Sequence, residues 1–490
     1  MMSVSRRTFL KTGAAAVAGL TIAPSSILGK SFGHVSPSDK LNIMAVGIGG
    51  MGATDIGKMD SQNLIALADV DWSYAKPIFD KYPNAKRYKD YRKMYEEMGK
   101  SADAVVVATA DHTHAIIAAD AITLGKNVYV EKPLTHSIYE ARLLKNLAKK
   151  YGVVTQMGNW GSSGEGTRKV IQWVQRGEIG EVRKVEAFTD RPIWPQGLQR
   201  PEKVDKVPKT LDWDLFIGPA KFRPYNSIYH PWNWRGWWDF GTGALGDMAC
   251  HILHAAFVAL KLGYPSKLQG SSTSLLTDCA PSAQSIKYTF PTRENLPKLA
   301  LPECEVYWYD GGIKPERPLN LPNGKELNVD GGGVIMYGTK DTLVYGCYGH
   351  SPYLLSGREP EYVPGNHEIK DSEHQMDFVR ACKESPENRV PTYSDFSEAC
   401  DLTEMVDIGV LAIRLQSLNK VLEWDGQNMK FLNISPSETM RIMKVDGFSV
   451  HNGHPTFNKT FTEPFNALEF ANELVKHNYR EGWKLPEMPR

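Results

Sequence analysis

The sequence predicts a two-domain α/β protein, with a parallel sheet in the first domain and an open, mostly antiparallel sheet in an α+β second domain. Short apolar runs alternate with helical patterns from Leu41 to Asn159, as in a parallel sheet covered on both faces. Later runs alternate apolar and polar residues, as in strands with one covered face. Because 490 residues suffice for two cores, we expect the domains at 38–159 and 160–490.

A G-x-G-x-x-G turn follows the first apolar strand and leads into a helix. In such a turn Gly47 allows the tight bend and Gly49 lets the backbone approach a pyrophosphate, while Gly52 lets the helix pack close to the strand. The N–H groups that open the helix, around Gly50 and Met51, can face the phosphates. The pattern predicts a Rossmann domain that binds a dinucleotide at this turn.

A carboxylate closes the second predicted strand. Asp69 follows the run 63–68, about 20 residues beyond the glycine-rich turn. A carboxylate at this place can bind the adenosine ribose 2′- and 3′-hydroxyls and would repel a 2′-phosphate. Since no lysine or arginine follows at 70–72, the sequence favours NAD over NADP. The alternative is a glycine-rich turn in another kind of α/β protein, which the order of strand, glycines, helix and acid disfavours.

The remaining elements follow from periodicity and from glycine and proline breakers. In the first domain we expect strands at 104–109, 128–131 and 153–156 and helices at 113–124 and 138–150. In the second we expect strands at 182–189, 267–276, 284–290 and 304–309, a hairpin of 333–337 with 342–345, and helices at 166–176, 246–262, 374–383 and 396–416. The span 191–240, rich in proline and tryptophan, indicates loops.

The first 30 residues have the pattern of a bacterial twin-arginine export signal. The run Ser5-Arg-Arg-Thr-Phe-Leu-Lys11 precedes a mild apolar stretch, 12–23. The stretch is too short to anchor the mature protein across a bilayer, and no cysteine precedes Cys250 to carry a lipid. We therefore expect export to the periplasm with no stable membrane anchor. The alternative is a disordered tail that contains two arginines.

Composition restricts the partners. The formal net charge is +1, with 57 Lys and Arg against 56 Asp and Glu, and no basic block stands out. We therefore expect no nucleic-acid partner. The six cysteines are widely spaced without a C-x-x-C pair, which is typical of buried apolar positions, and their pairing stays undetermined.

Two polar segments close later strands of the first domain, at the edge where such sheets bind ligands. From the first segment we expect Thr109, His112 and His114 to contact the cofactor, although Asp111 equally suits a helix N-cap. The second is Glu131-Lys132-Pro133. Its lysine can polarise a substrate hydroxyl and stabilise an alkoxide as hydride leaves, whereas a strand-end lysine alone is usually a solvated charge.

A carboxylate and an imidazole lie near the start of the predicted helix at 246–262. Asp247 and His251 are four residues apart and share a helix face, so the acid can fix the tautomer of a histidine that accepts a hydroxyl proton. His254 extends the same face, so the three could instead bind a metal with an open position. No further ligand cluster is evident in the sequence, and we expect no metal.

Aromatic residues dominate the segment 229–240. Tyr229 and Trp238, with Trp194 upstream, offer flat faces for sugar C–H surfaces, and Arg235 offers hydrogen-bond donors. The competing interpretation is packing between domains or subunits, because buried aromatic residues mostly serve cores. We predict carbohydrate contacts from these four residues and from His254.

Together these residues resemble the Gfo/Idh/MocA oxidoreductases, a family named for glucose–fructose oxidoreductase and inositol dehydrogenase. The resemblance rests on the following motifs: Gly47-x-Gly49-x-x-Gly52, Asp69, Glu131-Lys132-Pro133 and Asp247-x-x-x-His251. An exported subgroup is similar over further runs: Thr155-Gln-Met-Gly-Asn159, Arg191-Pro-Ile-Trp-Pro-Gln-Gly, Leu211-Asp-Trp-Asp and Trp234-Arg-Gly-Trp-Trp-Asp-Phe-Gly-Thr-Gly.

The resemblance implies a Rossmann domain joined to an α/β domain whose open sheet mediates homo-oligomers. It implies a nicotinamide ring near Lys132, with Glu131 and Asn159 beside the cofactor and with Asp247 and His251 completing the site. Such enzymes oxidise or reduce a secondary alcohol of a sugar or cyclitol. One position departs from the pattern: inositol dehydrogenases often carry an acid where this sequence has a second histidine three residues after the first, so their substrate does not transfer directly.

Export constrains the chemistry further, because little free NAD is available outside the cytoplasm. We expect the dinucleotide to be held tightly and recycled in place. One closed cycle oxidises a first sugar and reduces a second. The other oxidises a ring carbon transiently, which permits elimination of a glycosidic substituent before the hydride returns. A third alternative, a sugar-binding protein without catalysis, is disfavoured by the presence of Lys132, Asp247 and His251 together.

Overall fold

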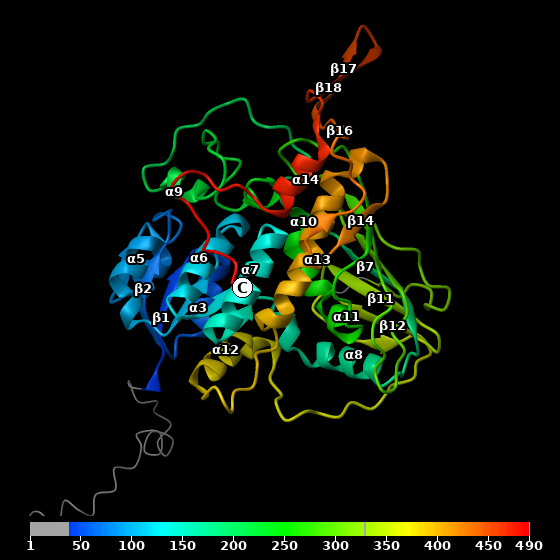
Figure 1. Ribbon diagram of the computed structural model, residues 1–490, viewed down its shortest axis with the longest axis horizontal. Coiled ribbons are helices and arrows are strands. Elements are labelled where there is room, and N and C mark those ends of the chain that lie inside the picture. Colours follow the sequence, from blue (N-terminus) through cyan, green and yellow to red (C-terminus); the bar gives the residue numbers. More distant parts are fainter. Residues whose placement is uncertain (1–38, 328–329, 490) are drawn as a thin grey trace, which may run out of the picture.

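The computed structural model describes residues 39–327 and 330–489, and Figure 1 shows how their helices and strands are arranged. The predicted export signal, residues 1–30, lies outside the described residues. Within the described ranges, no helix combines the length and the apolar character that a membrane crossing requires.

The first domain is built on a six-stranded parallel sheet in the order β3-β2-β1-β4-β5-β6. Its strands are β1 Asn42–Val46, β2 Asn63–Ala68, β3 Lys86–Tyr88, β4 Ala104–Val107, β5 Asn127–Val130 and β6 Thr155–Met157. The helices between them are α3 Gly50–Lys58, α4 Lys76–Lys81, α5 Tyr91–Met98, α6 Asp111–Thr123 and α7 Ile138–Tyr151. This is the Rossmann-like domain that the sequence predicted.

The central strands β1 and β4 are almost continuously apolar because helices cover both faces of the sheet. In β1, Ile43 and Ala45 lie in the cluster that holds the apolar residues of α3 and α4. The alternate residues, Met44 and Val46, lie in the larger cluster that holds those of α5, α6 and α7. Residues 43–46 of β1 and all residues of β4 therefore have buried side chains, whichever way they point.

One helix that covers the first sheet comes from far along the chain. Phe378 and Val379 of α12 (His374–Lys383) belong to the same buried cluster as Ile43. Figure 1 shows α12 beside the helices of the first domain. A division of the chain at residue 159 therefore leaves part of the first domain's core in the second half.

The second domain is built on a nine-stranded sheet in the order β13-β12-β11-β7-β10-β9-β8-β14-β15. Its strands are β7 Val182–Thr189, β8 Lys267–Ser272, β9 Gln284–Phe290, β10 Cys304–Tyr309, β11 Gly332–Gly338, β12 Thr342–Gly346, β13 Tyr353–Leu354, β14 Leu422–Asp425 and β15 Lys430–Phe431. All pairings in it are antiparallel except that of β7 with β10. The predicted fold class is thus confirmed.

Helices cover one face of the second sheet (Figure 1): α8 Glu165–Gln175, α10 Gly243–Ile252, α11 His254–Ala259 and α13 Phe396–Arg414. Buried and half-buried residues alternate along β9 and β10, as expected for strands with one covered face. The sequence predicts a single helix at 246–262. The structure has two, because α10 ends and α11 begins on either side of Leu253.

The remaining elements are short or peripheral: α9 Trp213–Ile217, α14 Ala467–Val475, and two-stranded pairs of β16 Thr439–Met440 with β19 Phe465–Asn466 and of β17 Met443–His451 with β18 His454–Phe461. The β17–β18 hairpin, which the sequence did not predict, projects from the molecule in Figure 1.

We expect Gly52→Ala to lower the free energy of unfolding by about 1–3 kcal/mol, because an added Cβ would lie 1.9 Å from the carbonyl oxygen of Gly47 and would push α3 off β1. Chemical denaturation measures the change. Gly57→Ala in the same helix is the matched control. Its Cβ would meet only the end of Lys81 at 3.8 Å, so helix propensity should raise stability slightly. Equal effects of the two substitutions would contradict the packing argument.

Candidate active site

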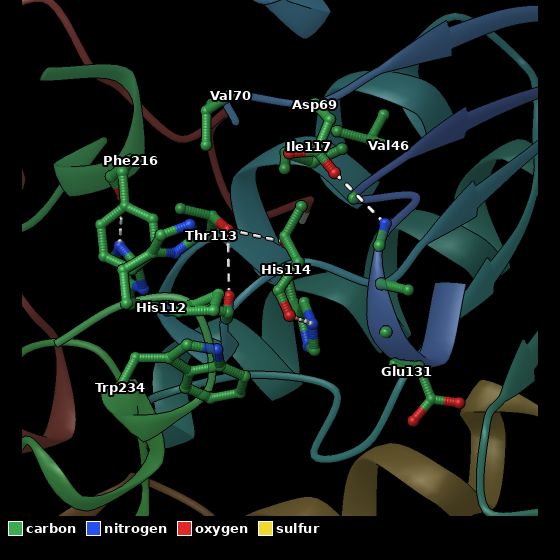
Figure 2. Close-up of a pocket in the computed structure, with 18 of the residues that line it drawn as sticks. Val46, Asp69, Val70, His112, Thr113, His114, Ile117, Glu131, Phe216 and Trp234 are labelled. Carbon is green, nitrogen blue, oxygen red and sulfur yellow. Dashed lines mark hydrogen bonds between the residues drawn. The ribbon is translucent and has the colours of Figure 1, made fainter. Parts of the chain in front are cut away.

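A cleft opens at the carboxyl ends of the first sheet, where the glycine-rich turn and the polar strand ends meet. It encloses about 1050 Å3 of space, part of it open to solvent. Figure 2 shows Asp69, His112 and Glu131 of the first domain's wall. The opposite wall comes from the second domain and the end of the chain: Phe216, His230, Trp232, Trp234, Arg235 and Trp483.

The glycine-rich turn has a backbone suited to a bound anion. Gly47 and Gly50 have φ of +76° and +48°, a region that glycine adopts readily. A Cβ at Gly49 would lie 2.2 Å from the ring of Tyr74, so no larger residue fits there. Helix α3 begins without a side-chain cap, which leaves N–H groups such as that of Met51 available. These features fit the pyrophosphate of a dinucleotide.

Asp69 lies at the same place and holds the turn in position. Its Oδ2 accepts hydrogen bonds from the backbone N–H of Ile48 at 2.9 Å and of Gly49 at 3.3 Å, and its Oδ1 accepts one from Asp71 at 2.9 Å. Burial raises the pKa of the Asp69 carboxyl, although these hydrogen bonds oppose the shift. The residue predicted to meet the ribose therefore also ties the end of β2 to the glycine-rich turn.

The two histidines of α6 line the cleft, but their ring nitrogens contact protein backbone. Nε2 of His112 lies 3.0 Å from the carbonyl oxygen of Phe216, and Nδ1 of His114 lies 2.8 Å from that of Pro133. Burial lowers the pKa of each to about 4, so both rings are neutral at pH 7. His112 thus attaches the second domain's loops to α6, and His114 supports the turn that follows Lys132. Thr109 lines the cleft beside them.

Lys132 reaches from the cleft to the second domain. Its Nζ donates to Oδ1 of Asp247 at 2.9 Å and to the backbone carbonyl of Asp247 at 3.1 Å. Nε of Arg235 donates to the same Oδ1 at 3.1 Å. Burial acts against ionisation of Asp247, but the two cations hold the pKa of its carboxyl well below the usual range. Burial likewise opposes the charge on Lys132, yet Asp247 keeps its pKa raised. Lys132 and Asp247 are therefore both charged at neutral pH.

His251 lies one turn beyond Asp247 on α10 and is not part of the cleft wall. Burial, reinforced by the nearby Lys132 cation, lowers the pKa of its ring well below the usual value, so the ring is neutral at pH 7. In the described part of the chain, its Nδ1 has no hydrogen-bond partner and no hydrogen bond joins it to Asp247. The expectation that Asp247 orients this imidazole is therefore not met, because two cations occupy the carboxylate.

Aromatic rings surround the imidazole instead. Trp160 and Tyr348 stack with ring centroids 4.2 Å apart, and the Tyr348 ring meets His251 edge-on at 4.9 Å. Sequence reasoning missed both residues. Trp160 directly follows Asn159 and could have been noticed there, but no spacing rule links Tyr348, in the turn after β12, to a helix almost a hundred residues earlier.

Asn159 and His254 lie beside this group rather than on the cleft wall. Nδ2 of Asn159 donates to the carbonyl of Cys250 at 3.1 Å and lies 3.1 Å from Nδ1 of His254. The other ring nitrogen of His254 is 3.7 Å from Glu398. Within residues 39–327 and 330–489, no group of three or more His, Cys, Asp or Glu side chains could hold a metal ion. The alternative set of Asp247, His251 and His254 is thus not assembled.

Glu131 lines the cleft and is buried with Asp55 of α3. Burial, with the nearby Asp55 carboxyl, raises the pKa of Glu131 well above its usual range, and burial raises the pKa of Asp55 to about 6. Oε1 of Glu131 has no hydrogen-bond partner in the described residues. The raised pKa of Glu131 weakens its competition with Asp247 for the ammonium of Lys132.

Of the residues predicted to bind carbohydrate in the aromatic segment, Arg235 lines the cleft and the other three do not. Nε1 of Trp194 donates to Gln196, and Tyr229 packs edge-on against Trp237 at 4.9 Å. Trp238 lines a second cavity. For these three the packing alternative describes the structure better, because all are buried, Tyr229 in an aromatic core of the loops and Trp238 in the large core of the molecule.

The same loops are fastened to the first domain next to Asp69. The N–H of Asp212 donates to the carbonyl of Val70 at 2.9 Å, and Asp71 pairs with His230 at 3.1 Å. Tyr74, Trp232 and Trp483 complete this side of the cleft, and nothing in their spacing along the sequence indicated it. The cleft is therefore covered by segments from three distant parts of the chain.

Two family models match the chain. The model described as "Oxidoreductase family, NAD-binding Rossmann fold" covers residues 41–159, and the one described as "Oxidoreductase family, C-terminal alpha/beta domain" covers residues 169–291. Both carry the family name GFO_IDH_MocA.

Several curated proteins are similar. The uncharacterised oxidoreductase YdgJ of Escherichia coli is 26% identical over 63% of this chain and 78% of its own length. Inositol 2-dehydrogenase of Salmonella typhimurium is 26% identical over 28% of this chain, and the α-N-acetylgalactosaminidase of Shewanella oneidensis is 26% identical over 38%. The chain spans less than half the length of these last two proteins, 42% and 46%.

Solved structures share the fold. The WlbA dehydrogenase of Bordetella pertussis, in complex with NADH and UDP-GlcNAcA, aligns with a TM-score of 0.54 at 14% identity, over 79% of this chain and 99% of that one. GenD2 from gentamicin A biosynthesis, in complex with NAD, aligns with a TM-score of 0.51 at 18% identity, over 79% and 97%. With both domains matched by family models in order, the chain belongs to the Gfo/Idh/MocA family of NAD-binding oxidoreductases.

Proposed function

We propose that the protein is an exported enzyme that oxidises or reduces a secondary alcohol of a sugar, glycoside or cyclitol, with NAD held tightly and recycled in place. The contact between Lys132 and Asp247 at 2.9 Å carries the proposal. It fixes an ammonium group of the first domain against the second domain at the end of the cleft. The neutral imidazole of His251 is one helical turn away. Alcohol oxidation needs one cation and one base of this kind.

When bound, NAD supplies the hydride acceptor. The charge of Lys132 lowers the pKa of a substrate hydroxyl and stabilises the alkoxide that forms. Asp247, shared with Arg235, keeps this ammonium protonated and in place. His251 takes the hydroxyl proton and returns it when the reaction runs in reverse.

The walls of the cleft support a tightly held cofactor. The loops at 191–240 are bonded to the end of β2 through Val70 and Asp71, and Trp483 approaches from the end of the chain. Arg92 stacks on the ring of Trp483 at 4.3 Å and so fastens this tail to the first domain. Release of a dinucleotide would require these segments to separate, which favours reuse in place over exchange.

The redox-neutral alternative has one specific support. The α-N-acetylgalactosaminidase of Shewanella oneidensis matches 38% of this chain, and an enzyme of that name cleaves a glycosidic bond. A transient ketone next to the leaving group would need the same alkoxide stabilisation and the same base, so Lys132 and His251 serve both cycles. A sugar-binding protein without catalysis would not need a charged lysine close to a neutral histidine.

Export and assembly are parts of the same proposal. The twin-arginine pattern at 5–11 suits a protein that takes up its cofactor before it crosses a membrane. Homo-oligomers would form through the uncovered face of the second sheet, where Lys287, Glu305 and Tyr307 are only half-buried. Aromatic residues such as Tyr307 are enriched on surfaces that pack against a second copy.

We expect Lys132→Ala to lower turnover by about 10²–10⁴-fold while NAD stays bound, because the alkoxide loses its counter-charge but the cleft keeps its shape. His251→Ala should do the same through loss of the base. Steady-state rates and the absorbance of bound nucleotide measure the two properties. Lys93→Ala and His451→Ala, at exposed sites, are the matched controls. Near-normal rates in either active-site variant would overturn its assigned role.

A panel of sugars and glycosides should separate the two cycles. We expect substrates to change the absorbance of the bound nucleotide, because hydride moves to it in either cycle. Ketone product with accumulated NADH indicates net oxidation, whereas cleaved glycoside without net NADH indicates the redox-neutral cycle. No bound nucleotide and no spectral response to any member of the panel would favour the binding protein.

A further inference from the structure

A second cavity lies between the two domains, on the other side of His112 from the cleft. It encloses about 650 Å3 of space, part of it open to solvent. The first domain, the loops at 191–240 and the last hundred residues all contribute to its wall. The side chains that matter here are His112, His136, Trp238, Arg414, Phe470 and His477.

Arg414, the last residue of α13, supplies a cation to this cavity. Its guanidinium lies 5.3 Å from the ring centroid of Trp238 and 5.2 Å from that of Phe470, and such contacts hold an arginine in one orientation. Within the described residues it forms no hydrogen bond and no ion pair. Burial lowers its pKa to about 10, so the group is still charged at pH 7.

No carboxylate on the cavity wall forms an ion pair with this guanidinium in the described residues. Asp239 pairs with Arg223, Glu473 lies 3.9 Å from Nζ of Lys221, and Glu140 accepts a hydrogen bond from Tyr479. Burial also raises the pKa of Glu140 to about 7, so this group carries only part of a negative charge. Arg414 is therefore the one lysine or arginine of the described wall without an ion-pair partner.

Two histidines lie beside the cation. The rings of His136 and His477 are 4.9 Å apart, and Nε2 of each contacts a backbone carbonyl, of Gly241 at 3.3 Å and of His136 at 3.2 Å respectively. In the described structure their Nδ1 atoms make no hydrogen bond. Burial lowers the pKa of both rings, so they are neutral at pH 7, and protonation at Nδ1 would turn each into a further donor.

We propose that this cavity binds a small oxyanion, the group that phosphate, sulfate and carboxylates share, with Arg414 as its principal ligand. A guanidinium presents several donors in a plane and matches such a group in shape as well as charge. Binding would join α13 and the tail to the first domain. No such site follows from the oxidoreductase activity, and the cavity is separate from the cleft that holds the dinucleotide.

The test is calorimetric titration of the NAD-loaded protein with inorganic phosphate, sulfate or acetate at constant ionic strength. Loading with NAD fills the anion site of the main cleft. We expect saturable binding that weakens about tenfold or more in Arg414→Gln, as for loss of a charge-assisted hydrogen bond. Arg358→Gln removes an exposed ion pair with Glu178 and is the matched control that should leave binding unchanged. Comparison of the three anions identifies whether the site prefers a phosphate-like group or a carboxylate.

Affinity should also rise as the pH falls from 8 to 6, because protonation of Glu140, whose pKa burial raises to about 7, removes negative charge, whereas the lowered pKa values of His136 and His477 keep both rings neutral. Lys221, Asp239 and Glu473 also face the cavity. Arg414→Lys keeps the charge and should keep part of the binding, so it covers the case in which Arg414→Gln fails to fold. Absence of binding by all three anions, or equal binding by wild type and Arg414→Gln, would overturn the proposal.

Discussion

A single carboxylate oxygen joins the two domains at the active site. Oδ1 of Asp247 accepts hydrogen bonds from Lys132 of the first domain and from Arg235 of the second. The three side chains are only 12–15% exposed, so removal of the Asp247 carboxylate would leave two uncompensated cations in a nearly dry place, at a cost of about 3–5 kcal/mol. Trp232 and Trp234 flank the guanidinium of Arg235 at 3.9 and 4.3 Å. The position of the Lys132 ammonium therefore depends on the packing of both domains.

The charge states around this oxygen follow from burial and from the number of cations. Two cations share one anion, which leaves a net positive charge at the end of the cleft. Burial, reinforced by the Lys132 cation, keeps the imidazole of His251 neutral. On the other side, Glu131 and Asp55 are too buried to both ionise. Neighbouring groups with similar chemistry thus differ in protonation at the same pH.

Most of the fold could be predicted from the sequence, because each helix or strand depends mainly on residues close to one another along the chain. The strands Gln284–Phe290 and Cys304–Tyr309 and the helix His374–Lys383 lie at their predicted bounds, since periodicity and breakers act within a few residues. The contacts of the candidate site could be predicted from the sequence only in part. The spacing of four residues predicted a contact between Asp247 and His251. In the structure Asp247 instead accepts a hydrogen bond from Lys132, which lies 115 residues away along the chain. Trp238 shows the same limit, because nothing in its neighbours along the chain indicates which cavity it faces.

The placement of α12 bears on how the polypeptide acquires its fold during synthesis. The first sheet emerges from the ribosome complete after Met157, yet one of its faces still lacks Phe378 and Val379. Ile43, Ala45 and Val106 on that face stay partly uncovered until more than two hundred further residues have been made. A fragment that stops near residue 160 would expose an apolar surface and would be prone to aggregate. The nucleotide-binding half is for this reason not a separable unit, because its core is complete only when α12 has packed against the first sheet.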